Sequence, residues 1–251
     1  MNIPAGHPRY RSLMVRERLS EMVDRGLVTQ TGLISHGRGE AFDYLMGERS
    51  LEPSLRAERA AAAYLLRAEN PVVCVNGNAA ALDPENIIGL AKEVPAKIEV
   101  NIFHRTEKRM DLLISYMEEK GAKDVLGRDP DARISGLDSD RALCTRSGIY
   151  GSDVILVPIE DGDRAKALAD MGKTVISIDL NPLSRTSKAA TVSISDEMTR
   201  ALENIRRFVK EMKGKQDVIE EAVIEFSNEN NRKEIVSEIC SSLMSEFGRD
   251  V

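Results

Sequence analysis

Four short apolar segments of this 251-residue chain are each followed directly by polar residues that could bind an anion. Three of the polar segments contain an arginine, whose fixed fork of donors matches phosphate and carboxylate oxygens. Arginines that converge on one place repel one another unless an anion is present, so the pattern predicts a ligand with several negative charges. The segments are NGNA at 76–79, HRT at 104–106, EDGDR at 160–164 and DLNPLSR at 179–185.

Aspartates accompany the arginines in these segments. Asp161, Asp163 and Asp179 could offset the arginine charges, hold Mg²⁺ beside phosphate groups, or accept hydrogen bonds from a ribose. Each residue taken alone is equally well explained as an ordinary loop residue or helix cap. The whole set is harder to explain in this way, because the ends of parallel strands converge in space.

Two further segments combine glycines with polar side chains. Gly77, between Asn76 and Asn78, could take a positive φ and bring backbone N–H groups close to a ligand, although a simple tight turn is the alternative. The HGRGE segment at 36–40 predicts a glycine-rich loop that wraps an oxyanion. Arg38 would supply charge there, and His36 could orient it or move a proton. Alternatively, His36 satisfies a buried carbonyl and the glutamate at position 40 only pairs with Arg38.

The elements that must position these residues are five strands rich in Val and Ile, separated by helices. This alternation predicts a largely parallel sheet, whose strands present ligand-binding residues at their carboxyl ends. One strand alternates Ile98, Val100 and Ile102 with polar residues, which indicates a position near the sheet edge. The predicted strands are 71–75, 97–103, 153–158, 174–178 and 191–194, and the helices among them are 54–69, 84–93, 107–120, 163–171 and 196–212.

More helices are predicted outside the sheet. An amphipathic helix at 8–25 places Leu13, Leu19, Met22 and Val23 inward, and two helices follow at 216–226 and 232–247. The segment 127–151 has weak periodicity and predicts a long loop. We therefore expect an α/β, Rossmann-like, largely parallel sheet flanked by helices, with N-terminal and C-terminal helical extensions. The expected divisions are 1–52, carrying the first helix and the HGRGE loop, 53–212 for the core, and 213–251 for the C-terminal helices.

The composition argues against several classes of protein. A formal net charge of −6 gives no basic face for nucleic acid. No signal peptide and no apolar stretch long enough to span a bilayer is present, so we expect a cytoplasmic protein without a membrane partner. The three cysteines lie far apart without metal-ligand spacing. There is no P-loop, dinucleotide fingerprint, HExxH or nucleophile elbow.

Six segments, in order, resemble archaeal phosphopantothenate synthetase, the 4-phosphopantoate–β-alanine ligase of coenzyme A biosynthesis. The resemblance runs from about residue 3 to residue 212 and implies a homodimeric, Rossmann-like enzyme. It also implies that ATP drives the joining of 4-phosphopantoate to β-alanine, with release of AMP and diphosphate. The segments are HPRYRSL, GLISHGRGEAFDYLMGE, NPVVCVNGNAAAL, NIFHRTEKR, VPIEDGDRAKAL and DLNPLSRTSKAA.

The resemblance also implies roles for individual residues. Mg²⁺ would accompany ATP, and Arg38 would stabilise charge on the phosphates. The family's nucleotide contacts fall on Arg16, Arg38, Asp179, Leu180, Asn181, Arg185, Thr186, Glu197 and Met198, of which the last two depart from the family's usual form. From their loop positions we expect Asn78, Arg105, Asp163 and Arg164 to bind phosphopantoate, and His36, His104 or Asp161 to accept the ammonium proton.

The expected chemistry is the activation of a carboxylate as an acyl-adenylate, which the amine of β-alanine then attacks. Two other readings remain open at this point. One is a different nucleotide-dependent enzyme, such as a kinase or an ADP-forming ligase, and its nucleotide product would be ADP. The other is a non-catalytic nucleotide sensor, which would not turn over ATP in the presence of both substrates.

Overall fold

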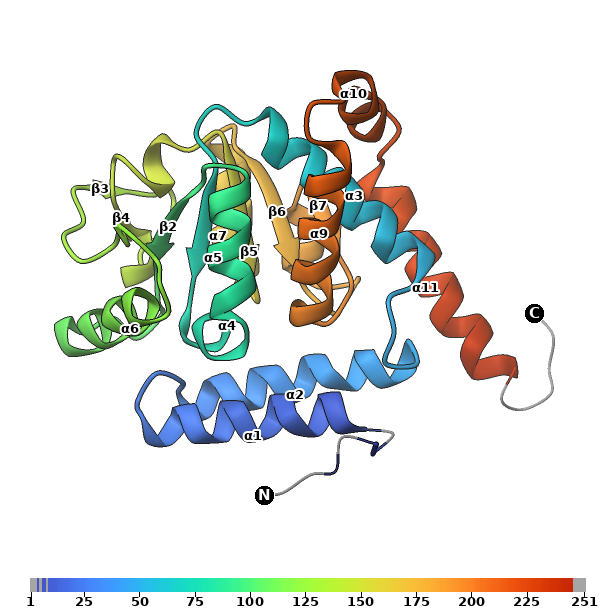
Figure 1. Cartoon of the computed structure of the whole chain (residues 1–251), viewed down its shortest axis with the longest axis horizontal. Helices are drawn as coiled ribbons and strands as arrows, with labels where there is room; N and C mark the ends of the chain where they lie inside the picture. The colour runs from blue at the N-terminus through green and yellow to red at the C-terminus, as the bar shows by residue number, and fades with distance from the viewer. Residues whose placement is uncertain (1–3, 5, 8, 246–251) are drawn as a thin grey trace.

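The protein, described by a computed structural model at residues 4, 6–7 and 9–245, is built around a parallel sheet in the order β2-β1-β5-β6-β7 (Figure 1). All five predicted strands are confirmed, and β2 lies at the edge, as its alternating pattern indicated. The strands are β1 (Val72–Val75), β2 (Lys97–Val100), β5 (Val154–Pro158), β6 (Thr174–Ile178) and β7 (Val192–Ile194).

Helices cover both faces of the sheet, because its central strands are apolar on both sides. Val73 and Val75 of β1 belong to a core shared with most of the helices, whereas Val72 and Cys74 belong to a second core on the opposite face. The first core includes α3 (Glu52–Arg67), α4 (Gly77–Leu82), α5 (Pro84–Glu93), α6 (Glu107–Glu119) and α9 (Met198–Met212), and the second includes α7 (Gly162–Asp170). The helices predicted between the strands are thus confirmed.

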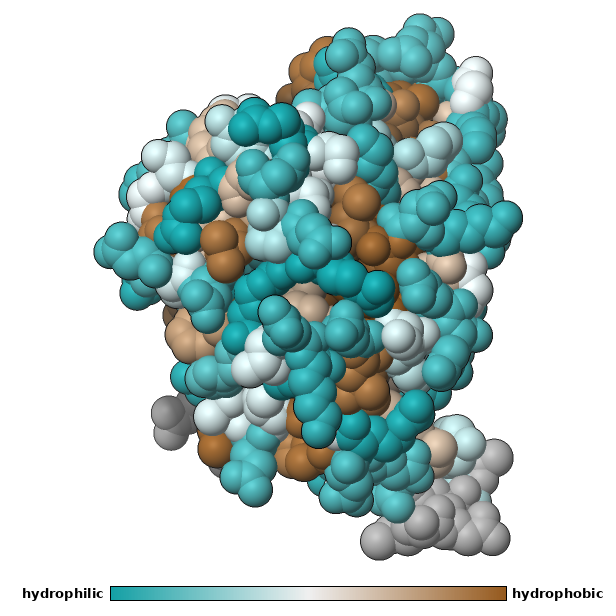
Figure 2. Space-filling model, turned by 90° about the vertical axis from the view of Figure 1, so that its left-hand side faces the viewer, coloured by the Kyte–Doolittle hydropathy of each residue, from teal (hydrophilic) through white to brown (hydrophobic). Residues whose placement is uncertain are grey.

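The predicted long loop between α6 and β5 has some regular structure. Two short strands, β3 (Ala132–Arg133) and β4 (Leu143–Cys144), pair antiparallel, and two 3-10 turns lie beside them, η1 (Asp140–Ala142) and η2 (Ile149–Gly151). The segment covers the edge strand β2, where the carboxylate of Glu99 accepts hydrogen bonds from the N–H groups of Thr145 (2.7 Å) and Ile149 (2.6 Å). Figure 2 shows that this side of the molecule is mainly hydrophilic, with apolar side chains in small separate groups.

Two helices, α1 (Tyr10–Asp24) and α2 (Gln30–Leu45), lie side by side across the carboxyl end of the sheet (Figure 1). In α1, Leu19 and Met22 are buried as predicted, while the predicted Leu13 and Val23 are only partly buried. The expectation of a loop at HGRGE was wrong, because these residues form the middle of α2.

A glycine of α2 just before this segment permits a close approach to α4. A Cβ on Gly32 would lie 2.6 Å from Oδ1 of Asn78. Asn78 uses this proximity to donate a hydrogen bond from Nδ2 to the carbonyl of Gly32, at 2.9 Å. The helix begins at Thr29, whose hydroxyl accepts the N–H of Gly32 at 3.1 Å.

At the C-terminal end, α10 (Gln216–Ile224) packs on α3, and α11 (Asn228–Ser245) packs on α3 and beside α2 and β7. The predicted helix limits at Pro8 and Phe247 lie outside the described residues. Among the helices that the structure describes, none is long and apolar enough to cross a membrane.

Gly77 begins α4 as a helical residue and has no positive φ, contrary to the expectation. A Cβ at this position would lie 2.3 Å from the carbonyl oxygen of Leu27, in the connection between α1 and α2. We expect Gly77→Ala to lower the free energy of unfolding by about 1–3 kcal/mol, because backbone must move to make room. Urea denaturation measures this change.

The matched control is Gly37→Ala in α2, where an added Cβ meets nothing within 4 Å. It should leave stability unchanged or raise it by up to about 1 kcal/mol, since alanine favours a helix. Equal stability of Gly77→Ala and the wild type would contradict the close approach.

Candidate functional site

A cavity of about 840 Å³ lies between α2 and the carboxyl end of the sheet, a size typical of small-molecule sites. All four polar segments singled out in the sequence contribute to its walls. Its centre is at β1 and β5, which are neighbours although the chain leaves them toward opposite edges of the sheet. Ligands bind at such a switch point in open parallel sheets, so the predicted convergence of strand ends is confirmed.

Asn76 joins the two central strands at the floor of the cavity. Its Oδ1 accepts the N–H of Ala79 (3.0 Å), which caps α4, and its Nδ2 donates to the carbonyls of Pro158 (2.9 Å) and Ile159 (3.0 Å). Ile159 has a φ of +53°, which is uncommon for a β-branched residue and costs on the order of 1–3 kcal/mol. The site therefore holds a strained backbone that Asn76 keeps in place.

Most of the site residues predicted from the sequence line this cavity. They are His36, Arg38, Asn78, His104, Asp161, Asp179, Leu180, Asn181, Arg185, Thr186, Glu197 and Met198. They come from α2, from the loops that follow the five strands, and from the start of α9. The tertiary structure thus brings together residues that lie up to 162 positions apart in the chain.

Four predicted residues, Arg16, Arg105, Asp163 and Arg164, are not among those that line it. Arg16 donates from Nε to Glu40 (2.9 Å), which raises the pKa of the arginine. Arg105 donates to the carbonyls of residues 127 (2.6 Å) and 128 (3.0 Å).

Asp163 forms an exposed ion pair with Arg185. Arg164 is 1% exposed, pairs with Glu160 and lies 3.4 Å from Sγ of Cys74, so its role is internal. The expectation that the strand-end arginines converge around the ligand is therefore met only by Arg185. The reason is that Arg105 and Arg164 turn toward backbone carbonyls and a buried carboxylate instead of the cavity.

Two arginines that were not among the predicted site residues line the cavity instead, although Arg109 ends the NIFHRTEKR segment. Arg141, in η1, donates from Nη2 to Glu160 (2.8 Å) and from Nε to Oδ1 of Asn101 (3.2 Å). Arg109, in the first turn of α6, donates to the carbonyls of His104 (2.7 Å) and Leu27 (3.3 Å). Burial lowers the pKa of both guanidinium groups, which nevertheless remain charged. Neither arginine directly follows an apolar run, so position along the chain carried no signal for them.

The loop after β6 is ordered around Asp179. Its carboxylate accepts the N–H of Asn181 (3.0 Å) and the hydroxyl of Ser184 (2.5 Å), and burial raises its pKa. The C-terminal helix α11 supports this loop, because Arg232 donates from Nε to the carbonyl of Pro182 at 2.6 Å. The C-terminal extension thus contributes to the site without lining it.

His36 is a half-buried titratable group on the α2 side. Burial lowers its pKa below the usual 6.5, with partial opposition from the negative charges of Glu40 and Glu197. Its Nε2 is buried and has no hydrogen-bond partner among the described residues. The imidazole is therefore neutral at pH 7, with a ring nitrogen available to accept a proton.

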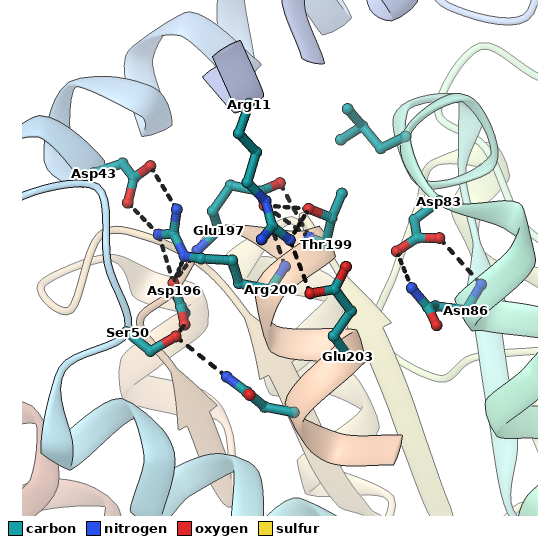
Figure 3. A network of polar contacts seen from close by, with 12 residues as sticks. Arg11, Asp43, Ser50, Asp83, Asn86, Asp196, Glu197, Thr199, Arg200 and Glu203 are labelled. Carbon is teal, nitrogen blue, oxygen red and sulfur yellow. Dashed lines mark hydrogen bonds and ion pairs between the residues drawn. The ribbon is translucent and has the colours of Figure 1, made fainter. Parts of the chain in front are cut away.

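A polar network ties α2 to the opposite wall (Figure 3). Arg200 of α9 pairs with Asp43 of α2 and donates from Nε to Oδ1 of Asp196 (2.9 Å), and Ser50 donates to the other oxygen of Asp196. Burial opposes the charge of Arg200, but the two aspartates outweigh it and raise the pKa of the arginine. Arg200 therefore stays charged over the whole physiological range of pH, whereas burial raises the pKa of Asp43.

Glu197 has a structural role beside this network. Its carboxylate accepts the N–H groups of Thr199 (3.0 Å) and Arg200 (3.2 Å), which caps α9. Glu58, behind the network in α3, is fully buried, and neither of its oxygens has a hydrogen-bond partner among the described residues. Burial, and then the negative charge of Asp196, raise the pKa of Glu58 to about 10. Glu58 is thus a neutral acid at pH 7.

No group of three or more His, Cys, Asp or Glu residues in the described ranges is arranged to hold a metal ion. Single carboxylates, including Asp161 and Asp179, do line the cavity.

The chain is similar to proteins of one named family. The family model described as phosphopantothenate/pantothenate synthetase matches residues 53–242, which extends beyond the core into α11. A 4-phosphopantoate–β-alanine ligase of Methanosarcina mazei is 53% identical over 243 residues, covering 96% of each chain. Ligases of the same name from Methanospirillum hungatei (54% identical, 84% of this chain and 86% of the relative) and Thermococcus kodakarensis (45%, 99% and 95%) are also similar.

The buried acid Glu58 should make stability depend on pH. Its folded pKa of about 10 lies above the ordinary value of 4.5, so between these values the folded state holds a proton that the unfolded state lacks. This group's contribution is complete below about pH 4.5 and is lost as pH rises toward 10, with a slope of at most about 1.4 kcal/mol per pH unit. Glu58→Gln stays neutral, so its stability should exceed that of the wild type increasingly from pH 5 to pH 9 in urea denaturation.

Glu52→Gln, at an exposed position of the same helix, provides the comparison. Its difference from the wild type should stay small and constant with pH. A constant difference for Glu58→Gln as well would mean that Glu58 is ionised in the folded protein.

Proposed function

Because the chain belongs to the family of phosphopantothenate/pantothenate synthetases, we propose that it joins 4-phosphopantoate to β-alanine in coenzyme A biosynthesis, with ATP converted to AMP and diphosphate. The observation that carries this proposal is the similarity over nearly the whole chain to ligases of that name. The cavity supports it, because it is large enough for two ligands and carries arginines on both sides.

The nucleotide is assigned to the side of the cavity formed by α2, β6 and β7. Arg38 and Arg185 face its phosphates, and Asp179, whose oxygens each have a second lone pair, accepts a ribose hydroxyl. Leu180 and Met198 supply apolar contact for the base. The family's contacts at Asn181, Thr186 and Glu197 lie along the same side.

Arg16 reaches the nucleotide only if it exchanges its partner Glu40 for a phosphate. This exchange is feasible in the proposed complex because the side chain of Arg16 is 42% exposed.

Mg²⁺ fits this site as a companion of ATP. The ion usually takes one or two protein carboxylates together with substrate phosphates and water. Asp161 and Asp179 line the cavity and would provide those carboxylates, which agrees with the absence of a larger acidic cluster in the described part of the chain. The bound ion would neutralise part of the phosphate charge.

The proposed reaction has two displacements. A carboxylate oxygen of 4-phosphopantoate attacks the α-phosphorus of ATP, the bond to the β-phosphate breaks, and diphosphate leaves. The amine of β-alanine then attacks the acyl carbon of the acyl-adenylate, and AMP leaves. His36 accepts the proton from the ammonium group, because its imidazole is neutral and its Nε2 is unpartnered. His104, which is exposed, and Asp161 are the alternative bases that the sequence indicated.

We also propose a cytoplasmic homodimer, as the family resemblance implies. The outer surface of α1 and α2 supports a dimer contact, because Ile34 is 70% exposed and Tyr10 and Tyr44 are also exposed there. The cytoplasmic location agrees with the charge of the two phosphorylated substrates, which cannot cross a bilayer unaided. Light scattering on the purified chain measures its mass.

Chromatography of the nucleotide product tests the function. With ATP, Mg²⁺, 4-phosphopantoate and β-alanine, we expect AMP and diphosphate in equal amounts, and no AMP when either acid or amine is omitted from multiple-turnover reactions. Carboxylate-¹⁸O in 4-phosphopantoate should pass into AMP. Formation of ADP, or label in inorganic phosphate, would contradict the acyl-adenylate route, and the absence of turnover would favour a nucleotide sensor.

A pH profile tests the role of His36. We expect kcat/KM of the wild type to fall at acid pH as the imidazole becomes protonated, with the midpoint below pH 6.5 because burial lowers this pKa in the free protein. His36→Gln should lower kcat by about 10²–10⁴-fold and remove that acid limb. His7→Gln, an exposed residue outside the cavity lining, serves as the control. An unchanged acid limb in His36→Gln would transfer the role to His104 or Asp161.

A further inference from the structure

The β2 side of the cavity carries more cationic than acidic groups. Arg141 and Arg164 share one carboxylate, Glu160, whose Oε2 contacts both. Arg109 has hydrogen bonds only to two backbone carbonyls in the described structure, and its buried Nε has no partner there. Glu160 is the carboxylate in direct contact with Arg141 and Arg164. Asp161 attracts Arg141 from a longer distance, and Arg109 has no carboxylate partner in the described structure. The surplus is directed at the cavity, since Arg109 and Arg141 line it while Arg164 does not.

These arginines are held rigidly before any ligand arrives. Arg141 is 6% exposed and is fixed on one edge by Glu160 and on another by Asn101, which itself donates to the carbonyls of Arg141 (3.2 Å) and Leu143 (2.9 Å). An arginine that is buried and oriented in this way loses little side-chain entropy on binding an anion. Arg109 has no counter-charge in direct contact in the described structure, and an anion bound in the cavity would supply one.

The opposite side of the cavity, near β6 and β7, has a different balance of acidic and basic side chains. Arg185 is already paired with Asp163, and the carboxylates of Asp179, Asp196 and Glu197 lie on that wall. A ligand with hydroxyl groups and a metal-bound polyphosphate suits that side. A free, metal-independent dianion suits the side of Arg109 and Arg141.

We propose that Arg109 and Arg141 bind the phosphate group of the acid substrate and so select the phosphorylated acid. This inference rests on the function proposed above. The carboxylate of 4-phosphopantoate must meet the α-phosphorus of the nucleotide near β5, and the phosphate is at the opposite end of the molecule. The phosphate therefore points away from the nucleotide side, toward β2, where the two arginines supply donors. Arg105 and Arg164, expected from the sequence to bind this substrate, are replaced in this role.

The experiment compares two substrates in several variants. KM and kcat are measured for 4-phosphopantoate and for unphosphorylated pantoate, at saturating ATP and β-alanine, and KM is measured separately for ATP. The variants are Arg109→Gln, Arg109→Lys and Arg141→Lys. The matched control is Arg128→Gln, which removes an exposed guanidinium that pairs with Asp111, a residue of α6 like Arg109. Arg128 is outside the cavity lining.

We expect Arg109→Gln to raise KM for 4-phosphopantoate by about 10- to 100-fold while KM for ATP and for pantoate changes little. The preference for the phosphorylated acid should fall by the same factor, and Arg109→Lys should retain part of it. Arg141→Lys should reduce the preference as well. A general loss of structure would lower activity with both acids equally, so the ratio isolates phosphate recognition. The control should keep the preference of the wild type.

Calorimetric titration of the wild type with 4-phosphopantoate separates the two proposals. If the wild type neither binds nor consumes this acid, the proposed function itself fails. If it binds and consumes the acid but all three variants keep its preference over pantoate, only the assignment of Arg109 and Arg141 is overturned.

Discussion

The geometry of the cavity depends on the buried ion pair between Asp43 and Arg200. This pair joins α2 to α9, in addition to the contacts that α2 makes with α1, α4 and α11. Asp43 is 3% exposed and Asp196 is 1% exposed, so both acids have lost their hydration and need the guanidinium. Removing one partner of such a pair typically costs about 3–5 kcal/mol, because the other charge stays buried. The pair therefore fixes the height of α2 above the strand ends, and with it the positions of His36 and Arg38.

Acidic and basic side chains are separated on two walls of this one cavity. Acids that line the β6 and β7 side are also used internally, to cap α9 or to order the loop after β6. Arginines on the β2 side are fixed by carbonyls, by Asn101 and by Glu160. Each wall thus has a preset electrostatic character before any ligand binds, which is the condition under which charged groups contribute most to binding and to transition-state stabilisation.

Elements outside the sheet complete the site. The segment between α6 and β5 covers the edge strand and carries Arg141, while α11 supports the loop after β6 through Arg232 and through Ile235 and Ile239, which pack in one cluster with Phe42 and Leu180. Both Phe42 and Leu180 line the cavity. The family model also extends into this helix, to residue 242.

The sequence alone determined the class of fold, the strands, the edge position of β2 and the set of strand-end segments that meet in one cavity. These features depend on local apolar patterns and on the general geometry of parallel sheets, so they can be inferred without coordinates. Only the tertiary structure decided which side chains face the ligand. HGRGE forms the middle of the helix α2, and Arg164 turns inward to pair with the buried Glu160. Arg109 and Arg141 line the cavity because of how the segments that carry them pack, which no short-range sequence pattern predicts. The orientation of the two side chains follows from packing and from partners distant in sequence.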